Sequence, residues 1–320
     1  MKYSLSVDMD GTMNPTPEKS GQPLEEKYLA DFCRAREVRY FTFGGSFWMS
    51  RGMRLFSPWP SSGAISLSSN DLNFMWKQGA MFLHYACSDD KPCYPGYDLV
   101  IDNKNYDLDS IISRKRRHNI RWALKRCTVE QISFDSLVES GLPLIEDTHN
   151  RQGRVSNDSV LEMWKNYFRL AESNPLFEAW GSFVSNQLAA FHVCLYVGGA
   201  VHIEMTFSRT DLLKYHPVDA LCFVSTQQSI TKDGITHVSY GRRPITGEAE
   251  GLINFKKSMG FREIPVKERV EINPIIRPVL FGPLGPIAHY IGERYSGRSM
   301  YARIFFALTE MLQGQVKDID

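Results

Sequence analysis

Three successive runs rich in apolar residues occur in the second half of the chain, at 177–184, 188–197 and 201–207. Residues 201–207 alternate between apolar and polar with the period of two that is typical of a strand, and the other two runs have the length and composition of buried strands. Ser185-Asn186 and Gly198-Gly199 separate these runs, and two-residue links of this composition favour tight hairpin turns. The pattern therefore predicts an antiparallel meander of three strands.

Helical spacing of apolar residues surrounds this meander. Helices are predicted at 134–150, at 157–173 with Ser156 or Asn157 as its cap, and at 217–232, where Pro217 suits a first turn. The other predicted elements of this half are a strand at 129–132, a strand at 235–240, a short helix at 254–259 that Gly260 ends, and a closing strand at 262–268.

The first half has a weaker pattern. Its first twenty-five residues are polar and contain Asn14-Pro15 and Pro17, so we expect a loosely ordered start rather than a core strand and helix. Further on, the predicted elements are a helix at 25–36, a strand within 36–45, a Pro/Gly-interrupted segment at 53–67 along a sheet edge, a helix capped by Asp71 that leads into a strand at 82–86, and a strand at 97–101.

Residues 112–127 predict a helix with an unusual charge. One face carries residues 112, 116, 120, 123 and 127 and is partly apolar. Most of the remaining surface is basic, through Arg114, Lys115, Arg117, Arg121, Lys125 and Arg126. This helix bridges the two halves, and it binds a nucleotide, an RNA backbone or no ligand at all.

Composition describes an ordinary folded protein. Over 320 residues, 43% are hydrophobic and 23% are charged, with a formal net charge of +1. This length suits two domains, and only the local cationic cluster suggests a phosphate-bearing partner. The six cysteines form no CxxC pair, and the histidines have no metal-ligand spacing. Without a signal-peptide pattern or a run of eighteen apolar residues, we expect a cytoplasmic protein with reduced thiols and no membrane span.

Two sequence segments resemble those of a known family. RKRRHNIRWALKRCTVEQI, at 114–132, resembles the basic helix and strand that join the two halves of Fem-like GNAT acyltransferases. GITHVSYGRRPITGEAEGLINFKKSMGF, at 234–261, resembles the late signature of the same family. The resemblance implies an α+β fold of two tandem GNAT-like modules, each with a mixed, mostly antiparallel sheet flanked by helices. We expect a degenerate module at 1–126, a transferase module at 127–275 and a helical tail at 276–320.

The same resemblance implies transfer of an acyl or aminoacyl group to an amine. The donor would be a CoA thioester or an aminoacyl-tRNA, used as a co-substrate, with no tightly bound cofactor and no metal. The acceptor would be an amine-bearing small molecule or a peptide such as a cell-wall precursor. The CoA-binding phrase expected after strand 201–207 is replaced by SRTDLLKYHPVDAL, which lowers the odds of acetyl-CoA without removing the family.

Candidate catalytic residues lie on strand 201–207. Alternation places His202, Glu204 and Thr206 on one wet face, opposite a packed face. In GNAT folds this strand splays from its neighbour and exposes main-chain N–H groups to the reacting carbonyl. Glu204 or His202 would then take a proton from the attacking ammonium, and Tyr215 would protonate the leaving group. The alternative is that the first two are solvated sheet residues and Tyr215 is a packing aromatic.

Candidate phosphate ligands gather around the next helix start. Free N–H groups at His216 and Val218, together with the helix dipole, favour an anion there, although Asp219 in the first turn opposes it. The expected donor-binding residues are His216, Val218, Arg242 and Lys256; the expected acceptor-binding residues are Tyr240, Arg243, Arg116 and Arg121. Such basic residues also occur as a solvated surface cluster.

Other hypotheses remain open. Residues 7–12 match the DxDGT motif of haloacid-dehalogenase phosphatases, which would make Asp8 the nucleophile and Asp10 the general acid of a magnesium-dependent enzyme; otherwise DGT is a turn. A GNAT-like pair can also serve as a non-catalytic binding module. Finally, His192 and His202 lie on adjacent predicted strands, where they approach one another or act as satisfied sheet histidines.

Overall fold

The protein divides into two compact units. In a computed structural model, the described residues are 3–7, 13–17 (backbone only), 24–61, 63–88, 93–154, 156–242, 250–278, 290 and 294. Of these, unit 1 contains the residues up to 97, residue 242 and the residues from 265 onward, whereas unit 2 contains residues 98–241 and 250–264. Strands β7 (Tyr94–Ile101), β12 (His237–Arg242) and β13 (Arg262–Ile272) contribute residues to both units.

Unit 1 is built on the strand order β3-β4-β5-β6-β13. Its strands are β3 (Tyr40–Phe43), β4 (Ser46–Ser50), β5 (Leu55–Pro58) and β6 (Phe82–Ala86), with helices α1 (Leu24–Ala35) and α2 (Ser69–Lys77). Neighbours pair antiparallel except β5 and β6, which are parallel. Trp48, Phe56 and Leu83 lie in the buried core, where burial of aromatic and aliphatic area stabilises the unit.

The structure of this unit differs from the sequence predictions at four places. The segment 53–67 does not follow a sheet edge: β5 pairs with β4 on one side and β6 on the other, and all four of its residues are buried. Strand β4 was missed, although Gly44-Gly45 between two apolar runs favours a hairpin. The polar start forms an antiparallel pair, β1 (Tyr3–Val7) with β2 (Met13–Pro17). In addition, Ser68 rather than Asp71 caps α2, in a capping box.

Unit 2 has the strand order β7-β12-β11-β10-β9-β8. Its strands are β8 (Cys127–Ile132), β9 (Phe177–Val184), β10 (Gln187–Val197), β11 (Ala200–Ser208) and β12 (His237–Arg242). The predicted meander is confirmed, because β9, β10 and β11 pair antiparallel in succession. Both predicted turns have positive φ at both residues, 48° and 64° at Ser185-Asn186 and 61° and 73° at Gly198-Gly199, as a type I′ turn requires.

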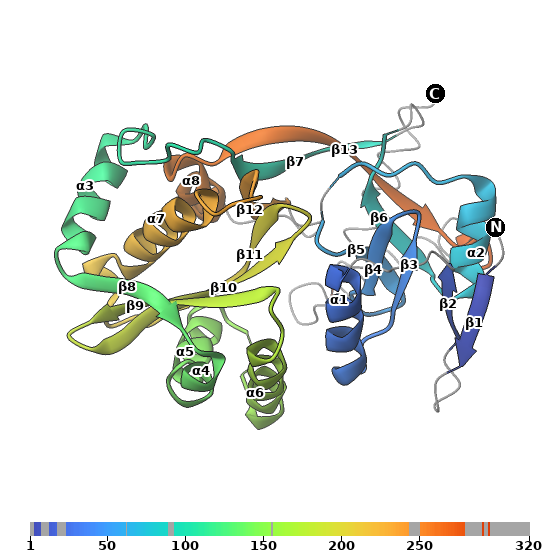
Figure 1. The fold of residues 1–320 in the computed structure, drawn as a ribbon, viewed down its shortest axis with the longest axis horizontal. Helices are drawn as coiled ribbons and strands as arrows, with labels where there is room; N and C mark the ends of the chain where they lie inside the picture. The colour runs from blue at the N-terminus through green and yellow to red at the C-terminus, as the bar shows by residue number, and fades with distance from the viewer. Residues whose placement is uncertain are drawn as a thin grey trace. The chain divides into compact units, whose positions relative to one another are not determined.

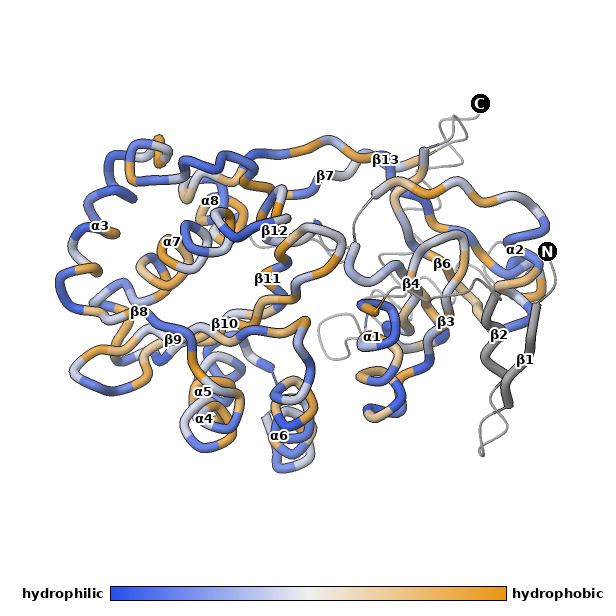
Figure 2. The backbone as a smooth tube through the Cα atoms, viewed as in Figure 1, coloured by the Kyte–Doolittle hydropathy of each residue, from blue (hydrophilic) through white to orange (hydrophobic). Residues whose placement is uncertain are grey.

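Helices cover both faces of this sheet. Helix α7 (Pro217–Ile230) lies on one face, and α4 (Phe134–Ser140), α5 (Leu142–Arg151) and α6 (Asp158–Glu172) lie on the other (Figure 1). The helix predicted at 134–150 is therefore two helices that meet at Gly141. The cationic helix α3 (Arg114–Leu124) packs beside α7, and α8 (Glu250–Ser258) precedes β13. Figure 2 shows α3 as largely hydrophilic and α7 as largely apolar.

The two units repeat one arrangement. In unit 1 an antiparallel run β3-β4-β5 leads through α2 to the parallel neighbour β6. In unit 2 the run β9-β10-β11 leads through α7 to the parallel neighbour β12. The fold is therefore the expected α+β fold of two GNAT-like modules, each with a mixed, mostly antiparallel sheet and flanking helices.

The compact units divide the chain differently from the expected boundary at 126. Residues 98–126 belong to unit 2, because α3 packs on α7. The end of β13 belongs to unit 1, because Glu268–Ile272 pair antiparallel with β6. Most of the expected tail at 276–320 lies outside the described residues. Among the residues that the structure describes, no helix combines the length and apolar character needed to cross a bilayer.

Candidate functional site

Strands β11 and β12 part partway along their length. They pair in parallel at three positions, Ala200 with His237, Val201 with Val238, and His202 with Ser239. Beyond these positions β11 continues to Ser208 and β12 to Arg242 with no further pairs in their described register. One side-chain hydrogen bond crosses the parted region, between Thr206 Oγ1 and Tyr240 Oη at 3.0 Å. The parting that the family resemblance implies is therefore present.

A β-bulge lies beside this parting. Val193 pairs with Met205 and the next residue, Cys194, pairs with Ile203, which leaves Glu204 as an extra residue on β11. A bulge of this kind shifts the alternation of a strand by one position. Glu204 is therefore in an irregular part of the strand, partly exposed, close to where β12 departs.

The expectation of one wet face on β11 was wrong. Directly opposed residues share a face, so His202 shares the face of Leu195, whereas Thr206 shares the face of His192. On β10 those two partners are an odd number of residues apart, so they point to opposite sides of the sheet. His202 and Thr206 consequently lie on opposite faces, and His192 and His202 do not approach one another. The bulge at Glu204 is the reason, and alternation alone does not reveal a bulge.

His202 is a buried, neutral histidine. Only 6% of its surface is exposed, and within the described chain its Nε2 atom has no hydrogen-bond partner. Burial, with a smaller contribution from His237, lowers the pKa of His202 to about 4. The two rings meet edge to face with their centroids 6.5 Å apart. A base this weak holds a proton poorly at neutral pH, so Glu204 is the better candidate for proton removal.

Charged side chains of the protein already surround the N-terminal end of α7. His216 has φ 55° at the cap position, and Pro217 contributes no N–H group. Asp219, 5% exposed, forms an ion pair with Arg116 and lies 3.5 Å from His216 Nδ1. Arg116 also donates from Nε to Ser258 Oγ at 2.9 Å. The expected phosphate site at His216 and Val218 therefore faces a buried carboxylate that already has a cationic partner.

Main-chain amides of the turn between β11 and α7 are largely occupied. Thr148 Oγ1 accepts the Ser208 N–H at 3.0 Å, and the Asp147 carboxylate accepts the N–H and the hydroxyl of Thr210, both at 2.6 Å. The amides of Arg209, Leu213, Tyr215 and His216 donate to carbonyl groups of the protein. A donor pyrophosphate would find few free N–H groups here, which is consistent with the missing CoA-binding phrase.

Other expected ligands have protein partners. Lys256 is buried, donates to the Tyr240 carbonyl at 3.1 Å and lies 4.7 Å from the centre of the Tyr240 ring. Arg242 belongs to unit 1, where its Nη2 donates to the Ser61 carbonyl at 2.9 Å and its Nε lies 3.5 Å from Glu268. Arg242 and Lys256 thus belong to different compact units.

Tyr215 is partly buried and packs against a cluster that includes Ala123, Cys127 and Ala220. This apolar environment favours the alternative that Tyr215 is a packing aromatic over a role as proton donor to a leaving group. Arg243 lies outside the described residues, as do Asp8 and Asp10 of the phosphatase motif. In the described part of the chain, no group of three or more His, Cys, Asp or Glu side chains has the geometry of a metal site, and all six cysteines are free thiols.

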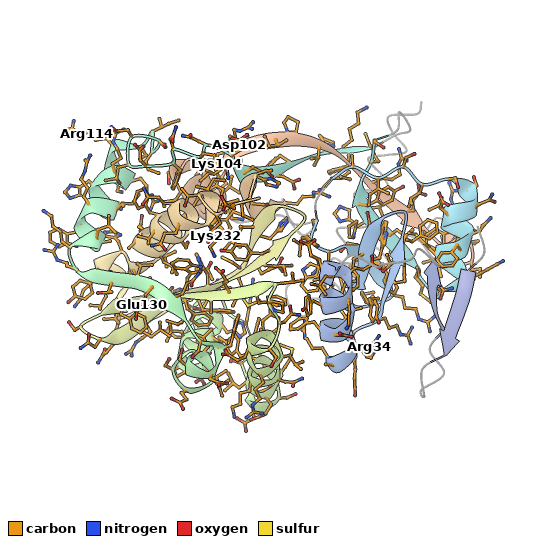
Figure 3. All side chains as sticks on the ribbon, in the orientation of Figure 1. Arg34, Asp102, Lys104, Arg114, Glu130 and Lys232 are labelled. Carbon is orange, nitrogen blue, oxygen red and sulfur yellow. The ribbon has the colours of Figure 1, made fainter. Side chains whose placement is uncertain are left out.

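Helix α3 and its C-terminal end present an uncompensated cationic surface. Its exposed cations are Arg114, Lys115, Arg121, Lys125 and Arg126, and residues 114–126 include no acidic residue. Figure 3 labels Arg114 at the beginning of this helix. Trp122 is 41% exposed among these cations, and the Arg126 guanidinium lies 3.3 Å from its ring centre. Within the described chain, no carboxylate pairs with Arg114, Lys115, Arg121 or Lys125.

Sequence reasoning missed the partners that matter most at this site. It did not identify Asp219 as the ion-pair partner of Arg116, or Thr206 as the partner of the Tyr240 hydroxyl. It also missed Asp147, which binds the turn from α5. Each contact joins segments far apart in the chain, and no spacing pattern signals such a pair.

Solved structures with this arrangement include FemX. The match has a TM-score of 0.56 at 12% identity and covers 82% of this chain and 96% of that chain. The fold is Fem-like. A C-terminal domain of a putative lysylphosphatidylglycerol synthetase from Agrobacterium fabrum matches with a TM-score of 0.53 at 14% identity, covering 82% and 94%. L-PGS from Bacillus licheniformis matches with a TM-score of 0.51 at 12% identity, covering 85% and 98%.

No protein-family profile matches the sequence, and no curated protein is similar to it in sequence. At such low identity the structural matches show the Fem-like GNAT fold and nothing finer about the reaction. The geometry and chemistry of the site are therefore the basis for assigning a reaction.

Proposed function

We propose that this protein transfers an aminoacyl group from aminoacyl-tRNA to an amine, at the parting of β11 and β12. The observation that carries the proposal is this parting, with Glu204 in a bulge beside it and the Thr206–Tyr240 hydroxyl pair across it. A parted strand leaves main-chain N–H groups without strand partners, and such groups stabilise the negative charge that develops on a reacting carbonyl oxygen.

Glu204 is the proposed general base. Its carboxylate takes a proton from the acceptor ammonium, and the amine nitrogen then attacks the ester carbonyl of the donor. The carbon–nitrogen bond forms and the ester bond breaks. The attacking nitrogen loses a second proton, and the terminal ribose oxygen of the tRNA takes it up and leaves as a hydroxyl. His202 is less suitable, because burial lowers its pKa to about 4. Its neutral ring, with Tyr215 in an apolar cluster, supports structural roles for both.

Two observations favour aminoacyl-tRNA over acyl-CoA as the donor. First, the amides of the β11–α7 turn are largely bonded to protein atoms, and the Asp147 and Asp219 carboxylates lie at this turn. Second, the exposed cations of residues 114–126 surround Trp122, a composition that suits the phosphates and bases of RNA. On this proposal Arg121 contacts the RNA backbone, whereas Arg116 serves the Asp219 ion pair.

The acceptor remains a class rather than a compound. The proposal keeps the expected amine, on a small molecule or on a peptide such as a cell-wall precursor, with Tyr240 close to it. Because one similar structure is named as a domain of a putative lysylphosphatidylglycerol synthetase, phosphatidylglycerol also belongs in the acceptor panel, where its hydroxyl group is the alternative to an amine.

A donor and acceptor screen tests the reaction. Purified protein is incubated with radiolabelled aminoacyl-tRNAs or acyl-CoAs and a panel of amines, peptides and phosphatidylglycerol vesicles, and products are identified by mass. Transfer from an aminoacyl-tRNA to an amine or peptide that Glu204→Gln lowers, with an unchanged thermal midpoint, supports the proposal, whereas transfer to phosphatidylglycerol alone refutes the amine acceptor. Transfer from acyl-CoA alone refutes the donor assignment, and no product with any pair leaves the non-catalytic binding module as the better hypothesis.

A charge-reversal variant tests the RNA surface separately. Arg114→Glu, Arg121→Glu and Lys125→Glu together should weaken tRNA binding and lower the slope of log affinity against log salt by about 2 to 3, because each phosphate contact contributes about 0.7 to 0.9. Lys27→Glu, Arg39→Glu and Lys77→Glu together are the matched control, since all three are exposed cations of unit 1 and the net charge changes equally. Equal affinity and slope in the two variants would remove α3 from the proposal.

A further inference from the structure

His192 is a buried histidine that the proposed reaction leaves unexplained. It lies on β10 with none of its surface exposed, and within the described chain neither of its ring nitrogens has a hydrogen-bond partner. Burial alone lowers its pKa to about 3, so the ring is neutral at neutral pH. A neutral imidazole brings one N–H donor and one acceptor nitrogen. Buried polar groups are nearly always hydrogen-bonded, so two unpaired nitrogens in a core are an exception that calls for a cause.

His192 is one member of a row of polar side chains across the sheet. It lies directly opposite Trp180 of β9 and Thr206 of β11, so all three side chains share one face. Trp180 Nε1 is also buried and without a hydrogen-bond partner in the described structure. Thr206 Oγ1, in turn, bonds Tyr240 Oη at 3.0 Å. The row therefore ends at the parting of β11 and β12.

The face that carries this row is covered by α7. Tyr196 lies four residues beyond His192 on β10, on the same face, and its hydroxyl bonds Ser229 Oγ of α7 at 2.9 Å. Trp180 and His192 therefore lie under a helix and away from bulk solvent, where a hydrogen bond is stronger than in water, whereas Thr206 and Tyr240 are partly exposed at the parting.

The direction of one hydrogen bond decides what Tyr240 offers to a substrate. Either hydroxyl of the Thr206–Tyr240 pair is able to donate. If Tyr240 donates inward to Thr206, it presents only lone pairs at the parting. If Thr206 donates to Tyr240, the Tyr240 hydroxyl keeps its own proton as a donor. An indole N–H only donates, so Trp180 can serve only as the first donor of a row that runs toward Tyr240.

We infer that His192 is a positioning residue that orients the Tyr240 hydroxyl as a hydrogen-bond donor to the substrate. In the oriented row, Trp180 Nε1–H donates to one nitrogen of His192, the N–H on the other nitrogen donates to Thr206 Oγ1, and Thr206 donates to Tyr240 Oη. Donors and acceptors then match at every step and no proton is transferred. The row closes when a small side-chain rotation or one bridging water joins His192 to its neighbours.

Nitrogen NMR of the imidazoles tests the row without any substrate. In protein labelled with ¹⁵N-histidine, His192 should give the signals of one neutral tautomer from about pH 5 to about pH 8, because both nitrogens have defined partners. Thr206→Val and Tyr240→Phe should each shift these signals or replace them by a tautomer mixture. Thr128→Val, at an exposed position of β8, is the matched control and should leave them unchanged. His192 signals that are the same in all four proteins overturn the inference.

The role in turnover rests on the proposed transferase function. His192→Phe should lower kcat by about tenfold with little change in KM, as expected for one hydrogen bond that strengthens in the transition state. His192→Gln keeps a donor and an acceptor and should recover part of the loss. In a Tyr240→Phe background, His192→Phe should have no further effect, because its target hydroxyl is gone.

The two proposals fail in different ways. Losses that multiply in the double variant overturn the positioning role and leave the transferase function standing. If no donor and acceptor pair reacts, the transferase proposal fails and the NMR signals still decide whether the row exists.

Discussion

Replacing Arg116 by alanine tests whether its guanidinium stabilises unit 2 or serves mainly to bind a substrate. The side chain pairs with the buried Asp219 carboxylate, donates to Ser258 at 2.9 Å and lies 4.7 Å from the centre of the Phe255 ring. These contacts join α3 to α7 and α8. If they hold the unit together, removal of the side chain lowers stability whether or not a substrate is present.

The expected loss follows from these contacts. Removing one partner of a buried ion pair costs about 3–5 kcal/mol. Arg116 keeps 20% exposure, and the dipole at the start of α7 still stabilises the Asp219 carboxylate, so the lower end applies. Loss of the cation–π contact with Phe255 adds about 0.5–1 kcal/mol. The free energy of unfolding should fall by about 3–4 kcal/mol, which moves the thermal midpoint of a unit of this size by about 10 °C.

Calorimetry, with hydrogen exchange of peptides from α3 and α7, measures the effect in unit 2. Arg121→Ala is the matched control on the same helix, where the side chain is exposed, and should change stability by less than about 0.5 kcal/mol. Arg116→Lys should be intermediate, because lysine keeps the charge and loses the planar fork. If Arg116→Ala is no more destabilising than Arg121→Ala, the ion pair contributes nothing measurable and the structural role assigned to Arg116 is wrong.

Three further outcomes are expected. Glu204→Gln should lower turnover by about 100- to 10,000-fold, the range for a lost general base, with an unchanged midpoint; unaffected turnover in the transfer assay removes this residue from the mechanism. The pKa of His202 is about 4 in the folded protein, below its ordinary value of 6.5. The buried neutral ring therefore contributes its full stability above pH 6.5. This stability is lost as the pH falls toward 4, because the unfolded chain then binds a proton that the folded protein does not. His202→Gln should therefore reduce the drop in urea midpoint between about pH 7 and about pH 5, and an equal drop in both proteins contradicts the burial argument. In unit 1, a Cβ at Gly96 would lie 2.6 Å from Glu268 Cδ, so Gly96→Ala should cost about 1–3 kcal/mol in a urea titration. Gly251→Ala in unit 2, where an added Cβ has no neighbour within 4 Å, should be neutral or slightly stabilising in the same titration.

Local patterns predicted most of unit 2. The meander of β9, β10 and β11, its two hairpin turns, the start of α7 at Pro217 and the Asn157 cap of α6 all appear where the sequence places them. Each depends on residues within a few positions of one another, so a linear pattern contains the information. The same is true of the cationic helix α3, whose charge is a property of its composition.

Unit 1 was predicted less well for the same reason. Its strands are short, and β5 is interior because β4 and β6 pair with it, which its own four residues do not reveal. The return of β13 to pair with β6 likewise joins residues almost two hundred positions apart, as Ile272 with Phe82. Such pairings depend on long-range contacts, which no local period encodes.

The candidate site divides along the same line. Sequence alone named Glu204, His202 and Tyr240, together with a helix start that suits an anion, because residue type and order suffice for that. Only the tertiary structure decided what each group meets. Because of one extra residue in β11, His202 and Thr206 lie on opposite faces of the sheet. Arg116 forms an ion pair with a carboxylate in the first turn of α7. Chemistry of this kind is decided by burial and by partners distant in sequence, because both the charge state of a side chain and the direction of its hydrogen bonds depend on what packs against it.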